Sequence, residues 1–516
     1  MKHFLCLISL LIICHPAFAA KPNILWITAE NMGPDLGCYP DSPYSKQVST
    51  PNIDKLAREG LRYRLAFDTS PGCSPSRSAF MTGMYQTTLG AHNHRSHRND
   101  HFQLPDGVRP LTHRLIEAGY FAANIMRVDK KMIGTGKTDL NFEVNGPMLN
   151  PAIQIKASPA VLSIDDKGQN DRNSARLYHS SEWTDLKAHQ PFFAQINLPV
   201  VERTSKNGVH GFVGEDETPA FGNQVHPTTT DPDNITPPPY YPDHPITRKD
   251  WAAYLDTVHD VDTRAGEILA RLAADGLAEN TIVIFFADNG RLEARGHHWC
   301  YDSGERVPLI VRWPASHPAP SDYKAGTVSD RLISLLDLTA TTLSFAGIKK
   351  PIGMASEVFL GPDASPPRKY AFSARDRCDD VPQRIRSVRS TRYRYIHNFM
   401  PEIPFSHPAP YKDTGYPVMA LLRRLQAEGK LTPPQAALMA PRLPDEEIYD
   451  LENDPFEIHN LAADPKHQQQ RKDMSAALDA WIESSNDQGR TPEPPEIVEQ
   501  WRARMQEWFG NPKVPR

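Results

Sequence analysis

One cysteine of this chain lies among residues that favour chemistry over packing. Residues 70–83 surround Cys73 with prolines, serines and glycines, and Arg77 follows four residues later. The apolar residues 79–81, closed by Gly83, predict a short helix whose first amide groups face the thiol. A lone cysteine is more often a buried structural residue, but the polar flanks predict an accessible one. A thiol beside an arginine and a helix start is expected to have a lowered pKa and to act as a nucleophile.

Polar residues also follow two runs that predict buried strands. Residues 23–28 and 281–286 are almost continuously apolar, as in strands of a parallel sheet that is covered on both faces. The carboxyl ends of such strands form the edge at which ligands bind. A simple polar turn after each strand is the alternative. The residues at these two ends are Glu30, Asn31, Asp288 and Asn289.

A histidine-rich tract covers residues 90–101. Its histidines are spaced by two, three and four residues and lack a clear set of zinc ligands. The tract is expected either to form a pocket wall that contacts an anionic substrate or to be a solvated loop. The candidates for substrate contact are His92, His94 and Arg95.

Two motifs suggest other functions, but the spacing of their residues does not match either function. The interval between Cys73 and Arg77 differs from that of a phosphatase loop. Residues 134–139 resemble a nucleotide-binding loop, but the required first glycine is replaced by Lys131. Nucleotide binding is therefore rejected.

The order Cys-x-Pro-Ser-Arg at residues 73–77, followed by Thr82-Gly83, resembles the signature of the formylglycine-dependent type I sulfatases of the alkaline phosphatase superfamily. The resemblance implies that a formylglycine-generating enzyme converts Cys73 to an aldehyde, 3-oxoalanine. The hydrate of this aldehyde attacks sulfur in that family, and sulfate is then expelled. The resemblance also implies a calcium ion. Its expected ligands are Glu30, Asn31, Cys73, Asp288 and Asn289.

The same resemblance assigns further catalytic positions. Arg77 and Lys137 are expected to offset charge on the sulfuryl group. Three positions depart from the family pattern, because relatives carry histidine where this chain has Asp139 and Glu202, and lysine or arginine where it has His297. The proton for the leaving group is expected from His297 or Glu202.

Residues 33–39, the histidine-rich tract and residues 384–389 are similar to the branch that contains heparan N-sulfatase and bacterial relatives. This likeness implies a sulfated carbohydrate as the substrate, carrying a sulfate ester or a sulfamate. Two alternatives stay open. One is a phosphodiester or phosphonate monoester hydrolase of the same superfamily, and the other is a protein that binds sulfated glycans without cleaving them.

Alternating strands and helices predict an α/β domain over residues 20–383, with a mostly parallel sheet flanked by helices, as in alkaline phosphatase. A smaller α+β domain is expected over residues 384–516. Helices are expected at 251–273, capped by Asp250, and at 332–343. A last sheet strand is expected at 370–373.

Composition narrows the choice of partner and compartment. The 516 residues include 57 basic and 62 acidic ones without a basic stripe, which argues against a nucleic-acid partner. Residues 1–19 have the pattern of a cleaved export signal and predict a periplasmic or extracellular protein. No other apolar run approaches the length of a membrane span. Four cysteines follow the signal, and with Cys73 modified the three that remain do not suggest a disulfide framework.

Overall fold

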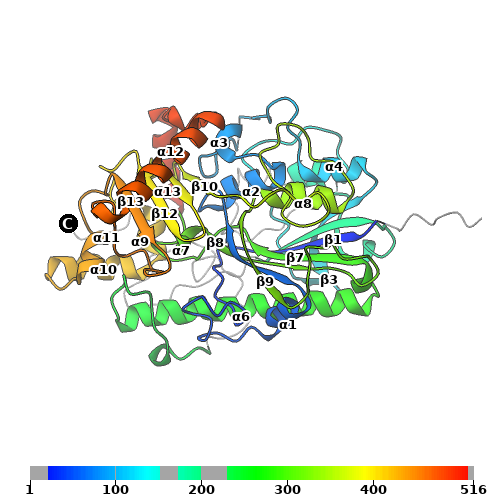
Figure 1. The fold of residues 1–516 in the computed structure, drawn as a ribbon, viewed down its shortest axis with the longest axis horizontal. Coiled ribbons are helices and arrows are strands. Elements are labelled where there is room, and N and C mark those ends of the chain that lie inside the picture. The colour runs from blue at the N-terminus through cyan, green and yellow to red at the C-terminus, as the bar shows by residue number, and fades with distance from the viewer. Residues whose placement is uncertain (1–20, 99, 152–171, 199–228, 510–516) are drawn as a thin grey trace, which may run out of the picture.

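A computed structural model describes residues 21–98, 100–151, 172–198 and 229–509 (Figure 1). The predicted export signal lies outside these residues. Most of the strands form one large sheet, in which β1 pairs in parallel with β6 and β7, while β8 runs antiparallel to β7 and β2. In spatial order the sheet contains β4 (Lys131–Met132), β3 (Phe121–Val128), β6 (Phe192–Leu198), β1 (Asn23–Ala29), β7 (Thr281–Ala287), β8 (Arg306–Arg312), β2 (Leu61–Phe67) and β9 (Thr327–Ser334), with β5 (Ser180–Glu182) beside β3. The predicted mostly parallel α/β sheet is confirmed.

Helices cover both faces of the large sheet (Figure 1). The long helix α6 (Pro245–Ala274) and α1 (Pro51–Glu59) pack together on one face. The other face carries α2 (Cys73–Thr82), α4 (Leu111–Glu117) and α8 (Asp337–Phe345), which contact one another. Two short helices, α3 (Gln86–Leu89) and α7 (Asp302–Glu305), lie in the connections. None of the helices in the described ranges has the length and apolarity required to span a bilayer.

The central strand holds the helix that carries Cys73. Trp26 of β1 is fully buried, and its ring meets Phe80 of α2 edge-on at a centroid distance of 6.0 Å. Phe193 and Phe286 from the neighbouring strands complete the same aromatic cluster at 5.1 and 5.4 Å. Because edge-to-face packing of this kind fixes ring positions, it fixes α2 above the carboxyl end of β1.

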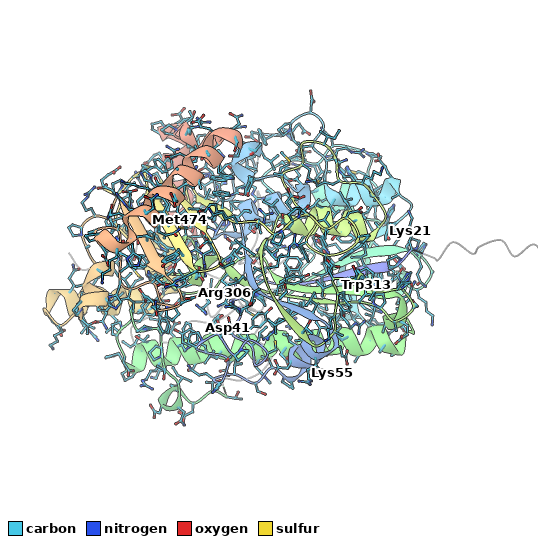
Figure 2. All side chains as sticks on the ribbon, viewed as in Figure 1. Lys21, Asp41, Lys55, Arg306, Trp313 and Met474 are labelled. Atoms are coloured by element: carbon cyan, nitrogen blue, oxygen red, sulfur yellow. The ribbon has the colours of Figure 1, made fainter. Side chains whose placement is uncertain are left out.

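A second, antiparallel sheet lies beside the first. It contains β10 (Ala371–Arg375), β11 (Ile385–Arg389), β12 (Tyr393–Asn398) and β13 (Glu446–Asp450). Met474 is buried against this sheet together with Val388 and Ile448 (Figure 2). Helix α12 (Gln468–Ser484) packs on this sheet. The same part of the chain contains α9 (Pro410–Gly415), α10 (Pro417–Ala427), α11 (Pro433–Leu438) and α13 (Pro495–Phe509), of which α10 packs on α6 and α13 on α9. The proposed domain boundary between residues 383 and 384 falls between β10 and β11, and one apolar core contains residues from both sides of it.

Three predicted elements differ from the structure. The helix predicted from 251 starts earlier, at Pro245, because proline suits a first helical position and the His244 ring accepts the Ile246 amide. The helix predicted at 332–343 starts at Asp337, because residues 332–334 pair with β2 as the end of β9. The strand predicted at 370–373 belongs to the small sheet, as β10.

Candidate active site at the carboxyl edge of the sheet

Cys73 is the first residue of α2, and only 6% of its surface is exposed. The prediction of an accessible thiol ahead of the helix is therefore wrong. Burial raises the pKa of the Cys73 thiol well above its usual value, although Lys137 opposes this shift. The predicted lowering of this pKa is also wrong, since the loss of hydration and the nearby carboxylates outweigh the helix start and the cations. The sulfur lies 3.7 Å from Oδ1 of Asn31.

Arg77 lies one turn further along α2, so its side chain shares a face with Cys73. Its Nε donates to Oδ2 of Asp288 at 2.9 Å, and its Nη2 donates to Oε1 of Glu30 at 3.3 Å. Burial disfavours the guanidinium, but these two carboxylates reverse the effect and raise the pKa of Arg77. The arginine is a fixed positive charge at this edge.

The two polar pairs meet because their strands are neighbours. β1 and β7 pair in parallel up to Ala29 and Ala287, so the residues that follow lie side by side. The Asn31 amide donates to Oδ1 of Asp288 at 3.0 Å, and Nδ2 of Asn289 donates to Oδ1 of Asn31 at 2.9 Å. The predicted meeting of these four residues at one edge is thus seen in the structure.

The oxygen atoms of this group suit a hard cation. Oδ1 of Asn289 is buried and accepts no hydrogen bond from any residue that the structure describes. Buried carbonyl oxygens are seldom left without a partner. Two carboxylates, Glu30 and Asp288, stand beside it, and oxygen-only sets of this kind prefer calcium or magnesium to zinc. The donor set therefore fits the calcium ion that the sequence predicts.

Lys137 and Asp139 lie within the same ion network. Nζ of Lys137 donates to Oε2 of Glu30 at 3.1 Å and lies 3.7 Å from Oδ2 of Asp139. Arg98 donates to the other oxygen of Asp139 at 2.5 Å. Burial alone would raise the pKa of Asp139, but Lys137 and Arg98 hold it below its usual value. Asp139 is accordingly a carboxylate at neutral pH, a hydrogen-bond acceptor without a proton to give.

Two residues of this network escaped the sequence analysis. Asn197, near the end of β6, accepts a hydrogen bond from Nη1 of Arg77 at 2.8 Å. It is a polar residue late in a buried strand, the same signal that revealed Glu30 and Asp288. Arg98 had no comparable signal, since it lies in a tract with many basic residues.

Of the two predicted catalytic acids, the structure describes only His297. Glu202 lies outside the described residues. His297 is buried, and neither of its ring nitrogens has a hydrogen-bond partner within the described parts of the chain. Burial, and then the charge of Lys412, hold the pKa of His297 well below its usual value. In the free protein this imidazole is neutral.

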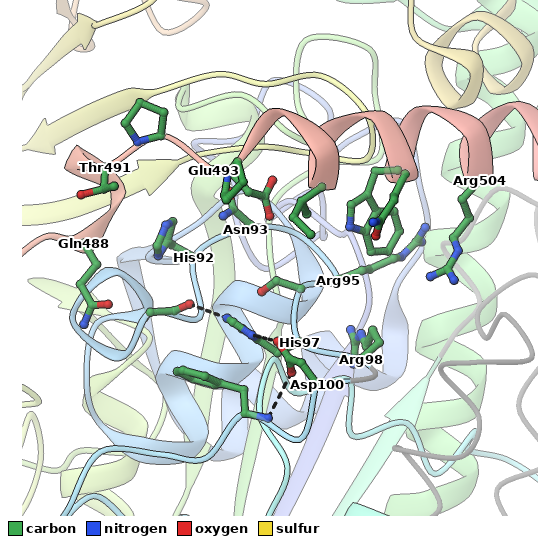
Figure 3. Close-up of a pocket in the computed structure, with 18 of the residues that line it drawn as sticks. His92, Asn93, Arg95, His97, Arg98, Asp100, Gln488, Thr491, Glu493 and Arg504 are labelled. Carbon is green, nitrogen blue, oxygen red and sulfur yellow. Dashed lines mark hydrogen bonds and ion pairs between the residues drawn. The ribbon is translucent and has the colours of Figure 1, made fainter.

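The predicted substrate-contacting residues do not form one surface. His94 is fully buried, and its Nδ1 lies 3.2 Å from Oδ1 of Asp379. His92 and Arg95 line a cavity of about 850 Å³ between the histidine-rich tract and α13 (Figure 3). The opposite wall carries Glu493 and Arg504. The backbone amide of Arg95 donates to Oγ of Ser74 at 2.8 Å, which links this wall of the cavity to the first turn of α2.

Comparisons with known proteins point in one direction. The family model described as Sulfatase matches residues 22–348. The chain is 31% identical to an ulvan-active sulfatase of Formosa agariphila, over 96% of this chain and 80% of that protein. It is 28% identical to human N-sulphoglucosamine sulphohydrolase, over 93% of each chain.

Solved structures share the fold. A 2-O GAG sulfatase superposes with a TM-score of 0.58 at 22% identity, over 93% of this chain and 96% of that one. A phosphonate monoester hydrolase from Silicibacter pomeroyi superposes with a TM-score of 0.59 at 16% identity, over 91% of this chain and 96% of that one. At these identities the likeness establishes the architecture alone.

Proposed function

Because this chain belongs to the sulfatase family of the alkaline phosphatase superfamily, we propose that it hydrolyses a sulfate ester or a sulfamate on a sulfated carbohydrate. The observation that supports this most is the group around Cys73. A cysteine at a helix start lies near a buried arginine and two pairs of side chains that carry oxygen atoms. A protein that only binds glycans would not need that arrangement.

The residues of this chain have distinct parts in the proposed reaction. Arg77 and Lys137 would stabilise negative charge on the sulfuryl oxygens as the bond to the leaving oxygen or nitrogen breaks. Glu30 and Asp288 fix these two cations through the contacts described above. Asn197 fixes the guanidinium from a third side. Since these contacts exist before substrate binds, the side chains would need little rearrangement on binding, and the free-energy cost of ordering them would be small.

Two groups complete the proposal. An aldehyde formed from Cys73 would supply, as its hydrate, the oxygen nucleophile that attacks sulfur. A calcium ion held by Glu30, Asn31, Asp288 and Asn289 would supply positive charge that favours the ionised form of this nucleophile. We further propose that the formylglycine-generating enzyme acts on this chain and that residues 1–19 direct its export.

The substrate class follows from the relatives. One acts on ulvan and another on N-sulfoglucosamine, and both are sulfated sugars. Arg95 and His92, which line the cavity between the histidine-rich tract and α13, are the residues proposed to contact such an anion. Phosphonate monoester hydrolysis is the competing function, and its only support is the architecture that this chain shares with the phosphonate hydrolase.

A screen of sulfate release tests the proposed function. The protein, produced together with a formylglycine-generating enzyme, would be incubated with ulvan oligosaccharides, N-sulfoglucosamine and 2-O-, 3-O- and 6-O-sulfated sugars. An aryl phosphonate monoester and an aryl phosphodiester serve as phosphorus substrates. Release of sulfate from one sugar, above the rate of the Cys73→Ala variant, is expected. Faster hydrolysis of the phosphorus esters, or no turnover of any sulfated sugar, would reject the proposal.

The leaving-group proton gives a separate prediction. A sugar alkoxide leaves poorly without an acid, whereas an activated aryl oxide hardly needs one. We expect His297→Ala to lower turnover of the sugar sulfate by about 100- to 10,000-fold and turnover of an aryl sulfate far less. The neutral His297 would gain its proton when the anionic substrate binds, because the added negative charge raises its pKa.

Glu202→Gln in the same pair of assays separates the two candidate acids. A selective loss with this variant and none with His297→Ala would transfer the role to Glu202. Equal losses on the two substrates would contradict both assignments. His467→Ala is a suitable control, because His467 pairs with Asp464 and belongs neither to the ion network nor to the lining of the cavity.

A further inference from the structure

Two histidines and one aspartate from three separate segments meet beside α2. His94 comes from the histidine-rich tract, His298 from the connection after β7, and Asp379 from the connection between β10 and β11. Nδ1 of His94 lies 3.2 Å from Oδ1 of Asp379, and Nδ1 of His298 lies 3.9 Å from Oδ2. One possible ligand atom from each residue lies within 4.8 Å of the other two. We call these three residues the His–His–Asp cluster.

The cluster is buried, and one of its ring nitrogens lacks a hydrogen-bond partner among the described residues. At most 4% of the surface of any of its members is exposed. Nε2 of His298 is a buried ring nitrogen without a hydrogen-bond partner among the described residues, whereas Nδ1 of His94 faces Oδ1 of Asp379. An unpaired buried polar atom costs about 1–3 kcal/mol. Such a cost at the His298 ring suggests a ligand that the described residues do not supply.

The charges around the cluster favour neutral imidazoles. Burial lowers the pKa of His94 and that of His298, while the contact with His94 helps to hold the pKa of Asp379 below its usual value despite burial. The two ring centroids are 5.1 Å apart, and the ring of His297 lies 3.9 Å from that of His298. Protonating both rings would place like charges close together, and Arg95 and Lys412 add to the repulsion. Two neutral imidazoles and one carboxylate offer lone pairs instead of protons.

We propose that His94, His298 and Asp379 bind a divalent transition-metal ion of the zinc class, at a site distinct from the calcium ligands at the ends of β1 and β7. Two nitrogens and one carboxylate oxygen are a common zinc set, and three protein ligands leave a fourth position open. The oxygen-only set suits a hard cation, whereas imidazole suits zinc, copper or nickel. His94, predicted from sequence to contact substrate, becomes a metal ligand in this proposal.

The side chains would have to turn to close on one ion. Zinc bonds of about 2.0–2.2 Å in a tetrahedron separate neighbouring ligand atoms by about 3.3–3.6 Å. The two Nδ1 atoms lie 3.2 and 3.9 Å from different oxygens of Asp379, and the ligand atoms of the three residues lie within 4.8 Å of one another. Cδ2 of each ring would lie about 4 Å from a Cβ placed on Gly72, so the cluster borders the residue before Cys73.

The proposal is tested by metal binding, independently of turnover. The purified protein, freed of transition metals and kept in excess calcium to fill the oxygen site, is titrated with cobalt(II) and with zinc. We expect one equivalent of cobalt to give the intense visible absorption of a four-coordinate ion, which zinc then displaces. His298→Ala and Asp379→Ala are expected to weaken binding by at least about 100-fold. His97→Ala, which removes the histidine of another His–Asp pair in the same tract, is expected to bind as the wild type does.

Arg95 offers a variant with the opposite effect. Its Nη1 lies 3.4 Å from Oδ1 of Asp379 and competes with a metal for that oxygen. Arg95→Gln is therefore expected to tighten cobalt binding.

Absence of the cobalt spectrum in the wild type, or an unchanged spectrum in His298→Ala, would overturn the proposal. If His298→Ala fails to fold by circular dichroism, His298→Gln replaces it, with the same expectation. Because the readout is spectroscopic, a sulfatase without this metal and a metal-binding protein without sulfatase activity give different results.

Discussion

Replacing Cys73 with alanine is expected to lower turnover of any sulfated substrate by at least about 1,000-fold, because the change removes the precursor of the nucleophile. Stability should change little, since one sulfur atom is lost at a helix position where alanine is favourable. The measurements are kcat with an aryl sulfate and the temperature of thermal unfolding. Intact mass of the wild type, made with the modifying enzyme, should show that the thiol of Cys73 has been replaced by an aldehyde.

Cys38→Ala is the matched control, because Cys38 is also unpaired and lies far from the ion network. It should keep full activity. Unaltered activity in Cys73→Ala would contradict the mechanism. A loss of similar size in both variants would show that the assay reports folding instead of chemistry.

The second large effect concerns the proposed calcium ligands, of which Asp288 and Asn289 form an informative pair. Both are proposed to bind the ion, but only Asp288 also pairs with Arg77. Asn289→Ala should abolish calcium binding and activity with a moderate loss of stability. Asp288→Ala should also abolish calcium binding and activity. It should lower the free energy of unfolding by about a further 3–5 kcal/mol, because the buried guanidinium of Arg77 loses a partner.

Elemental analysis and denaturant unfolding test this pair. Calcium should be found in the wild type and be absent from both variants. Zinc that is retained by the wild type but lost from Asn289→Ala would contradict the assignment of the oxygen site. Equal unfolding free energies for the two variants would contradict the structural role given to the Asp288–Arg77 contact.

Several parts of this architecture could be predicted because the signal is local. The runs at 23–28 and 281–286 predict strands buried on both faces, and polar residues directly after them predict an edge site. The parallel register of β1 and β7 then brings Glu30 and Asp288 together without further information. The same reasoning, applied to Asn197, would have found the third partner of Arg77.

Other parts depend on contacts between distant segments. The burial of Cys73 results from the packing of α2 against the Trp26 cluster and α8, which the local prolines and serines do not reveal. The predicted start of α8 is wrong because the apolar Leu332 and Ile333 suit a helix as well as a strand, and pairing with β2 makes them part of β9. The His–His–Asp cluster joins three connections, and no spacing in the sequence links His94 to Asp379.

Under the proposed conversion of Cys73 to an aldehyde, the position of this residue at the first turn of α2 would also set an order of events in the life of the protein. A thiol enclosed by the sheet edge and the neighbouring loops cannot enter the active site of another enzyme. Its conversion to an aldehyde would therefore have to precede folding, while residues 70–83 are still an extended peptide. A folded but unconverted molecule would be a dead end, recoverable only by unfolding. Recombinant yield of active protein should then depend on how the rate of conversion compares with the rate of folding, and treating purified folded protein with the modifying enzyme should recover almost nothing.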